Sequence, residues 1–136
     1  MRVGLALPHY DFSLPGAEPV TFERVAEVAT AAERLGFDSV WMSDHFFTSL
    51  ERYGGDERRY GSLEPLTTLA ALAPCTERVR LGTLVLSAGF RHPSVLAKSA
   101  TAIDLLSGGR LDLGVGAGWY APEFEAFAYP FGSAGE

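Results

Sequence analysis

Four short apolar segments alternate along the chain with three segments of helical periodicity, and this alternation constrains the fold more than any other feature. The apolar segments have the length of buried strands and cover residues 3–7, 39–43, 79–86 and 111–115. Each of the first three is followed by apolar residues at helical spacing, and Pro65 and Pro93 fit the first helical position. Strands that alternate with helices pair in parallel through right-handed crossovers. Two architectures fit this pattern: an open doubly wound sheet, or part of an eight-unit barrel.

Both architectures bind ligands at the carboxyl ends of their strands. The segments that follow the predicted strands are therefore expected on one rim; they are Pro8–Tyr10, Asp44–His45, Leu84–Ser87 and Gly116–Trp119. Glycines at every second position, 114, 116 and 118, are predicted to share one face of the last strand. Such a face suits close approach by a flat ligand or by another backbone, and equally a layer of small residues needed for packing.

Charge and cysteine content exclude several classes of function. The net charge of −6 argues against nucleic-acid binding, which depends on neutralising phosphates. The single cysteine, Cys75, allows no internal disulfide, and His9, His45 and His92 lack the spacing of a metal site, so we predict no metal. No apolar run is long enough to span a bilayer, and the first residues do not resemble a signal peptide. We therefore expect a cytoplasmic protein with no membrane partner.

In order and spacing, five pieces of the chain resemble the luciferase-like monooxygenase superfamily, whose members are TIM-barrel oxidoreductases that use a flavin or the deazaflavin F420. The pieces are RVGLALP, AERLGFDSVWMSDHF, ERVRLGTLVL, RHPSVLAKSATAIDLLSGGRLDLGVGAGW and FGSAGE. The resemblance implies a partial TIM (β/α)8 barrel of about four βα units. Because a complete barrel needs about 250 residues, residues 1–136 are expected to form the N-terminal half of the domain, without the C-terminal half.

The resemblance also implies roles for individual residues. His45 is expected to donate or accept a proton beside hydride transfer, work that suits the ordinary histidine pKa of about 6.5. Asp44 is expected to bind the polar edge of the cofactor or to fix the tautomer of the His45 imidazole. Leu84 and Val85 are expected to form an apolar wall behind the cofactor ring, often with a non-proline cis peptide in relatives. Thr83 is expected to add a hydroxyl near the ring, and Gly116, Ala117 and Gly118 are expected to form the floor under the cofactor.

Three positions depart from a familiar pattern or allow two interpretations. Phe46 follows His45 where flavin-using members often carry paired histidines, so the segment is more similar to the F420-using branch. Trp119 stands where some F420 enzymes carry a glutamate, and Glu123 is a nearby carboxylate that could replace it. Arg91, just before a helix start, could hold an anion, but a solvated charge on the rim is the favoured interpretation.

We therefore predict an oxidoreductase that transfers a hydride between F420, or alternatively FMN, and a small organic substrate. A flavin would also allow monooxygenase chemistry, because reduced flavin activates oxygen whereas reduced deazaflavin does so poorly. The first alternative is a truncated half-barrel that is inactive alone and associates with itself or with a complementing C-terminal half. The second is an open doubly wound domain that binds NAD, although GVGAGW does not match the dinucleotide fingerprint.

Overall fold

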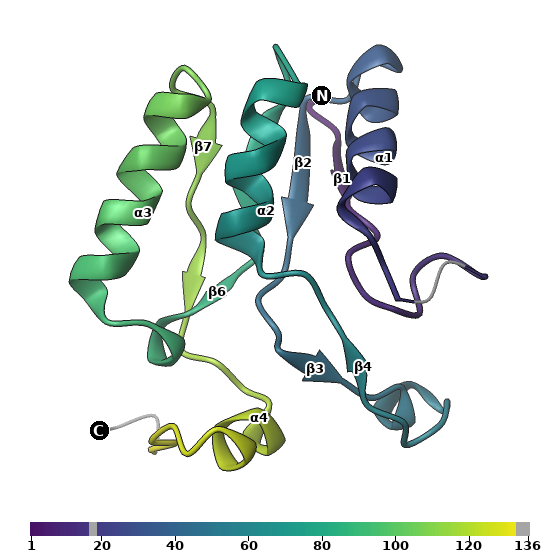
Figure 1. Cartoon of the computed structure of the whole chain (residues 1–136), viewed down its shortest axis with the longest axis vertical. Coiled ribbons are helices and arrows are strands. Elements are labelled where there is room, and N and C mark those ends of the chain that lie inside the picture. The colour runs from purple at the N-terminus through teal and green to yellow at the C-terminus, as the bar shows by residue number, and fades with distance from the viewer. Residues whose placement is uncertain (17–18, 133–136) are drawn as a thin grey trace.

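The computed structural model describes residues 1–16 and 19–132, and its elements alternate as the sequence predicts (Figure 1). The main elements are β1 (Gly4–Ala6), α1 (Phe22–Arg34), β2 (Ser39–Met42), α2 (Pro65–Leu72), β5 (Arg80–Thr83), α3 (Pro93–Leu106) and β7 (Leu111–Asp112). Shorter elements are β3 (Phe47–Thr48), β4 (Tyr60–Gly61), β6 (Leu86–Ser87), β8 (Val115–Gly116) and α4 (Ala121–Ala126). Most of the FGSAGE piece, residues 133–136, lies outside the described residues.

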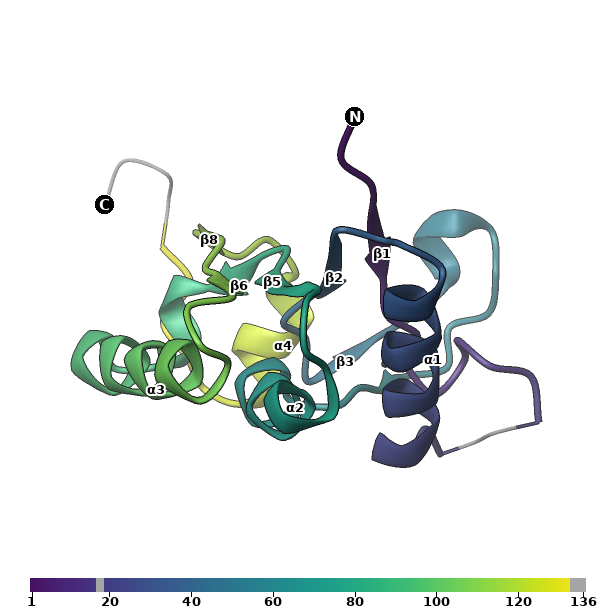
Figure 2. The same cartoon turned by 90° about the horizontal axis from the view of Figure 1, so that it is seen from above.

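The four main strands form one parallel sheet in the order β1-β2-β5-β7. Its register places Leu5 beside Val40, Val40 beside Leu81, and Leu81 beside Leu111. Helices α1, α2 and α3 all cover the same face of this sheet, as Figure 2 shows. A doubly wound sheet would reverse its strand order and carry helices on both faces. The arrangement is instead that of consecutive units of a (β/α)8 barrel, which confirms the predicted partial barrel.

The core lies between the sheet and the three helices. Val40 and Leu81 from the central strands are fully buried, as are Val25 from α1 and Leu69 and Leu72 from α2. Burying a side chain of this size stabilises the fold by about 1.5–3 kcal/mol. The apolar pattern of the sequence predicts this core correctly, because the residues have only to lie on the same face of their strand or helix and do not require one particular partner.

The strand ends depart from the prediction, because residues 79–86 and 111–115 do not form two continuous strands. The first of these segments ends its main pairing at Thr83, passes through a cis peptide bond between Leu84 and Val85, and resumes as β6, which pairs with β8. The Thr83 hydroxyl donates to the Gly114 carbonyl and accepts from the Gly114 N–H, both at 2.9 Å. This side chain therefore replaces ladder hydrogen bonds where the two strands separate.

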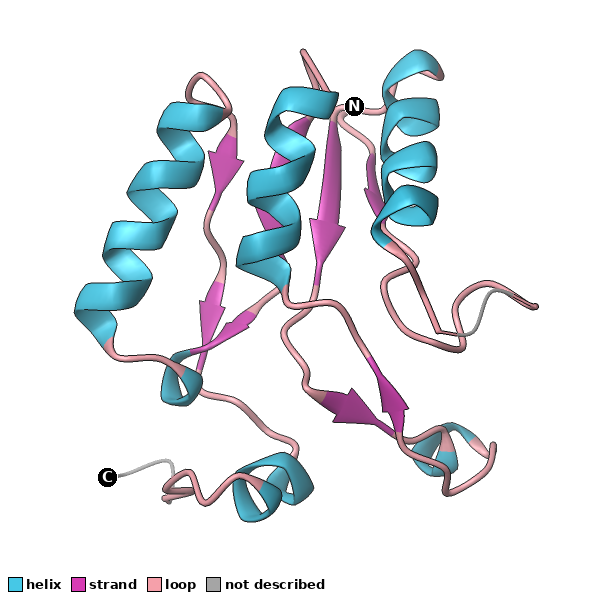
Figure 3. Cartoon of the chain, in the orientation of Figure 1, coloured by secondary structure: helices cyan, strands magenta, loops and turns pink. Residues whose placement is uncertain are grey.

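Two further elements lie at the end of the sheet to which its strands point (Figure 3). The long connection of residues 46–61 forms the antiparallel ribbon β3–β4 around a 3-10 turn at Glu51–Tyr53. The segment after Trp119 contains the short helix α4. Pro122 and Glu123 are helix-start signals in this segment, but six residues are too few to establish a periodicity.

The opposite face of the sheet carries no helix within residues 1–16 and 19–132. Here the Trp41 indole lies against the backbone of the two neighbouring strands at Gly4 and Gly82. A side chain at either glycine would collide with the indole. Arg80 and Asp112 form an ion pair on the same face, with 2.6 Å between Arg80 Nη2 and Asp112 Oδ1. None of the described helices is long and apolar enough to cross a membrane.

Candidate functional site

The segments that follow β2, β5 and β8 enclose a pocket of about 170 Å³. Of the predicted site residues, those that line it are Asp44, His45, Leu84, Val85 and Gly118. Ser87, which was predicted only to lie on the rim, and Glu123, which was named only as a possible substitute for the family glutamate, line it as well. The rule that parallel strands point their carboxyl ends to one edge therefore brings together residues that are far apart in sequence.

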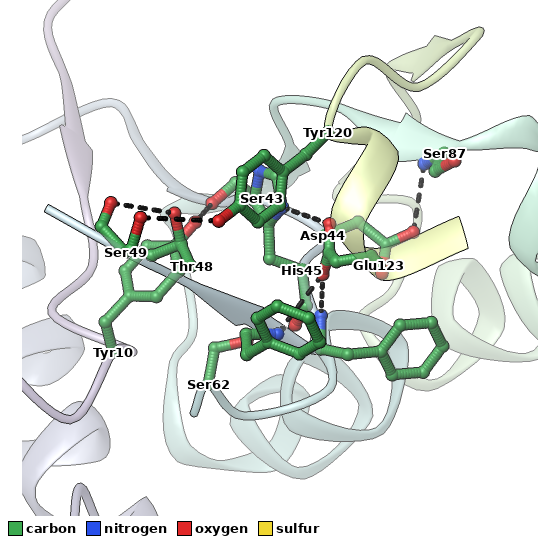
Figure 4. Close-up of polar contacts among 12 residues, drawn as sticks. Tyr10, Ser43, Asp44, His45, Thr48, Ser49, Ser62, Ser87, Tyr120 and Glu123 are labelled. Carbon is green, nitrogen blue, oxygen red and sulfur yellow. Dashed lines mark hydrogen bonds and ion pairs between the residues drawn. The ribbon is translucent and has the colours of Figure 1, made fainter. Parts of the chain in front are cut away.

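His45 lies in this pocket with its side chain 14% exposed. Its Nδ1 atom is 2.7 Å from Oε2 of Glu123, a contact drawn in Figure 4. The rings of Trp119 and Tyr120 meet the imidazole edge to face, with centroids at 5.8 and 6.1 Å. Outside the aromatic contacts, the His45 carbonyl accepts a hydrogen bond from the Ser62 hydroxyl. These contacts fix the ring from several sides.

Glu123 is the most deeply buried acid of the site, with 1% of its surface exposed. Its Oε1 atom accepts hydrogen bonds from the backbone N–H groups of Phe46 and Phe47, the latter at 3.2 Å. Buried carboxylates need such partners, because an unpaired buried charge is strongly destabilising. The sequence offered Glu123 only as a nearby carboxylate; its contact with His45, 78 positions away, has no local signal.

Asp44 does not fix the His45 tautomer, which corrects one of its two predicted roles. Its carboxylate accepts from the Ser87 N–H at 2.9 Å and is bound by both terminal nitrogens of Arg91, at 2.5 and 2.9 Å. This bidentate pair orients Asp44 toward the β6 side of the pocket, whereas His45 is paired with Glu123. The other predicted role, contact with a cofactor edge, stays a prediction.

Arg91 is not the solvated rim charge that the sequence favoured, because its side chain is only 16% exposed. It also binds Glu64, which caps α2 by accepting from the Thr67 N–H. Burial alone would lower the pKa of Arg91, but the two carboxylates outweigh burial and raise that pKa above its usual range. Burial raises the pKa of Glu64, but the hydrogen bonds from Thr67 and Arg91 lower it by more, so the pKa of Glu64 lies below its ordinary value.

Thr83 also departs from its predicted role. Its side chain is fully buried and its hydroxyl is engaged at both ends by Gly114, so the structure gives it a place between strands and not against a ligand. The glycines correct the prediction too. A side chain at Gly114 or Gly116 would meet Val85, whereas one at Gly118 would meet Phe124 and Ser87. Gly118 also has a φ of 86°, so it does not share the face of the other two.

Ser87 carries the one buried side-chain oxygen of the described residues that has no hydrogen-bond partner. The residue is 6% exposed and lines the pocket beside Asp44 and Gly118. Buried hydroxyls are nearly always paired. The hydrogen-bonding capacity of the Ser87 hydroxyl is therefore unused in this structure.

A second polar chain joins the ends of β1 and β2 next to the pocket. The Tyr10 hydroxyl lies 2.5 Å from Ser43 Oγ, which lies 3.0 Å from His9 Nε2, while His9 Nδ1 donates to the Leu7 carbonyl at 2.7 Å. Burial lowers the pKa of His9 and raises the pKa of Tyr10, so both groups are neutral near pH 7. The third histidine, His92, is separate: it caps α3 by accepting from the Ser94 N–H.

Comparisons with known proteins point to one family. The family model described as luciferase-like monooxygenase matches residues 1–135. An F420-dependent glucose-6-phosphate dehydrogenase from Amycolatopsis mediterranei is 42% identical over 95 residues, which are 69% of this chain and 27% of the relative. The oxygenase component of a flavin-dependent trigonelline monooxygenase from Acinetobacter baylyi is 33% identical over 104 residues, 76% of this chain and 26% of the relative.

The solved structures give the same result. The crystal structure of the monooxygenase RslO1 from Streptomyces bottropensis superimposes with a TM-score of 0.69 at 33% identity, covering 94% of this chain and 36% of that one. The chain thus spans about a quarter to a third of the length of the proteins that it matches. The relatives named here include both an F420-dependent and a flavin-dependent enzyme.

Proposed function

The chain belongs to the luciferase-like monooxygenase family, and we propose that it forms the cofactor-side part of an oxidoreductase that transfers a hydride between F420 and a small organic substrate. One observation carries this proposal. A single pocket brings together the His45–Glu123 pair, the apolar Leu84–Val85 segment and the unpaired Ser87 hydroxyl. An acid–base group beside an apolar wall with one free polar contact matches the needs of a flat redox ring.

The residues of the pocket fit such a cofactor in chemical type. Leu84 and Val85 are 62% and 42% exposed, so these two consecutive apolar side chains offer a surface for an aromatic ring. Ser87 Oγ and the remaining acceptor site of Asp44 would bind its polar edge. The pocket volume is below the roughly 300–1,000 Å³ of typical ligand sites, so these residues would contact one part of the cofactor. The floor role of Gly116, Ala117 and Gly118 belongs to the same proposal.

When bound, the cofactor would supply the hydride chemistry, and the side chains of this chain would supply position and proton transfer. His45 would move the proton: as a hydride leaves a substrate C–H, Nε2 would take the proton from the adjacent hydroxyl, leaving a carbonyl group. Asp44 is less suited to that task, because its oxygens already accept three hydrogen bonds. It would instead hold the cofactor edge in place.

F420 is favoured over FMN by two features. Phe46 follows His45, so the paired histidines of many flavin-using members are absent from this position. The relative from Amycolatopsis mediterranei named above is F420-dependent. The flavin-dependent relative supports FMN as the alternative, and with FMN the reaction would extend to monooxygenation.

Titration of the purified chain with F420 and with FMN, each followed by absorbance and fluorescence, tests the proposal. We expect F420 to bind with a perturbed spectrum, and Ser87→Ala to weaken binding about 5–10-fold, as expected for one lost hydrogen bond. The exposed Ser94→Ala on α3 is the matched control. A folded chain that binds neither cofactor would contradict the proposal.

A second candidate is a half-barrel that acts only with a complementing partner, either a second copy or a C-terminal half. The observation that favours it is the sheet face without a helix, together with the edge strands β1 and β7, each paired on one side only in the described sheet. Sedimentation of the chain separates the two candidates. A dimer that binds no cofactor would favour the second, whereas cofactor binding in any oligomeric state supports the first.

A further inference from the structure

We infer that Glu123 is a positioning residue that holds the proton of neutral His45 on Nδ1, so that Nε2 is free to accept a proton in the pocket. The inference rests on the proposed function only for the use made of Nε2. The tautomer itself is a property of the chain alone. A histidine can act as a base at one nitrogen only when the other nitrogen carries the proton, so the partner of Nδ1 decides which chemistry is available.

The contacts of the Glu123 carboxylate assign the proton. Oε1 accepts from the backbone N–H groups of Phe46 and Phe47, and Oε2 lies 2.7 Å from His45 Nδ1. Backbone N–H groups can only donate, and an ionised carboxylate can only accept. The two backbone donors directed at Oε1 match the ionised form of the carboxylate, whose Oε2 can then only accept, and this places the shared hydrogen on Nδ1.

The surroundings of His45 leave Glu123 as the group that sets the tautomer. Asp44, the adjacent carboxylate, is held by Arg91 and Ser87. Tyr10, Trp119 and Tyr120 contact the imidazole through their rings. Within the described part of the chain, no hydrogen bond joins any of these three side chains to His45.

The position of Glu123 in the fold also explains how the pair is held. Its carboxylate joins α4 to the chain just after β2, since it binds both His45 and the next two backbone N–H groups (Figure 4). Because Glu123 is 1% exposed, bulk water does not compete with it for Nδ1 in the folded chain. Glu123→Gln keeps an oxygen acceptor for the Phe46 and Phe47 N–H groups and changes the group that faces Nδ1.

Nitrogen NMR of the full chain labelled with ¹⁵N-histidine tests the inference, at a pH where the imidazoles are neutral. In the unsubstituted chain we expect His45 to carry its proton mainly on Nδ1. In Glu123→Gln the amide oxygen can still accept from Phe46 and Phe47, but the amide NH₂ faces Nδ1 as a donor. The tautomer population should then invert, with the proton mainly on Nε2.

Glu125→Gln is the matched control, because Glu125 lies on the same helix and is exposed. It should leave the His45 signals unchanged. His9 serves as an internal standard, since its Nδ1 donates to Leu7 in every variant. If Glu123→Gln does not fold, the unsubstituted chain still decides the question by its own tautomer.

The inference is overturned if His45 of the unsubstituted chain carries its proton mainly on Nε2, or if folded Glu123→Gln shows no change. Neither result depends on a bound cofactor. An Nδ1 proton in a chain that binds neither F420 nor FMN would remove the proposed function and keep the inference. Cofactor binding with an Nε2 proton would do the reverse.

Discussion

The helix-covered face of the sheet and the rim beyond its strand ends both contain buried side chains, but of different kinds. Between the sheet and the helices the buried residues are apolar, such as Val40, Leu72 and Leu81. At the rim the buried residues include Asp44 and Glu123, each held by named polar partners. Apolar packing tolerates substitutions of similar volume, whereas a buried charge depends on one particular partner. The apolar core therefore tolerates change at more positions than the rim, where each buried charge has its own partner.

His45→Ala should give the largest effect, which is a loss of activity without a loss of the fold. We expect the rate of F420-linked hydride transfer to fall about 10²–10⁴-fold, the usual contribution of a positioned acid–base group. The assay would use the donor substrate that a screen of small alcohols identifies. The circular dichroism spectrum should stay that of the folded chain, and an unchanged rate would remove His45 from the chemistry.

Leu81→Ala should have the opposite signature, with a large effect on stability. Leu81 is fully buried in the central strand β5, so the cavity should lower the free energy of unfolding by about 2–5 kcal/mol. Urea denaturation measures this change. Leu105→Ala, on an exposed position of α3, is the control and should change stability by less than about 0.5 kcal/mol. A similar loss in both variants would contradict the assignment of the core.

Arg91→Met tests whether the rim also contributes to stability. The substitution keeps an apolar stem but leaves the carboxylates of Asp44 and Glu64 close together without their shared cation. Breaking a buried pair costs about 3–5 kcal/mol; with Glu64 partly exposed we expect about 2–3 kcal/mol. Arg24→Met removes a solvent-exposed ion pair with Glu27 and should cost less than about 1 kcal/mol. Equal effects of the two substitutions would remove the distinction between them.

The smallest expected effect is a pH dependence of stability caused by His9. Burial lowers its pKa from 6.5 in the folded chain, so below about pH 6.5 the unfolded chain binds a proton that the folded chain does not. The free energy of unfolding should therefore decrease as the pH falls below 6.5, until the folded pKa is reached. His9→Gln should flatten this part of the pH profile, and His92→Gln, at an exposed residue, should not. The Glu64 contribution is lost only at lower pH, below its ordinary value of 4.5.

The sequence was sufficient for the frame of the molecule and for the location of the rim. Periodicity identified the strands near Leu5, Val40, Leu81 and Leu111 and the helices between them, because each needs only an apolar face. The strand-end rule then brought Asp44, His45 and Val85 to one pocket. Both successes rest on properties of short segments and on the general geometry of parallel sheets.

The side-chain pairs within the rim could not be predicted from periodicity or from the geometry of parallel sheets. Asp44 was expected from the resemblance either to bind the cofactor edge or to fix the tautomer of the adjacent His45, whereas the structure pairs Asp44 with Arg91 and His45 with Glu123. Successive side chains after a strand point in different directions, so adjacency in sequence does not imply contact. Thr83 and Arg91 were misassigned for a related reason: the side chain that a polar residue meets depends on how distant loops fold.

The hydroxyl of Thr83 has a consequence for how the pocket opens. This hydroxyl bonds to both the N–H and the carbonyl group of Gly114. The two parallel strands can therefore diverge here without leaving these buried backbone groups unpaired. The two strands therefore separate at Thr83, one residue before Leu84, which lines the pocket. Residues 83 and 114 form a coupled unit, and redesign of the cavity mouth would have to change them jointly.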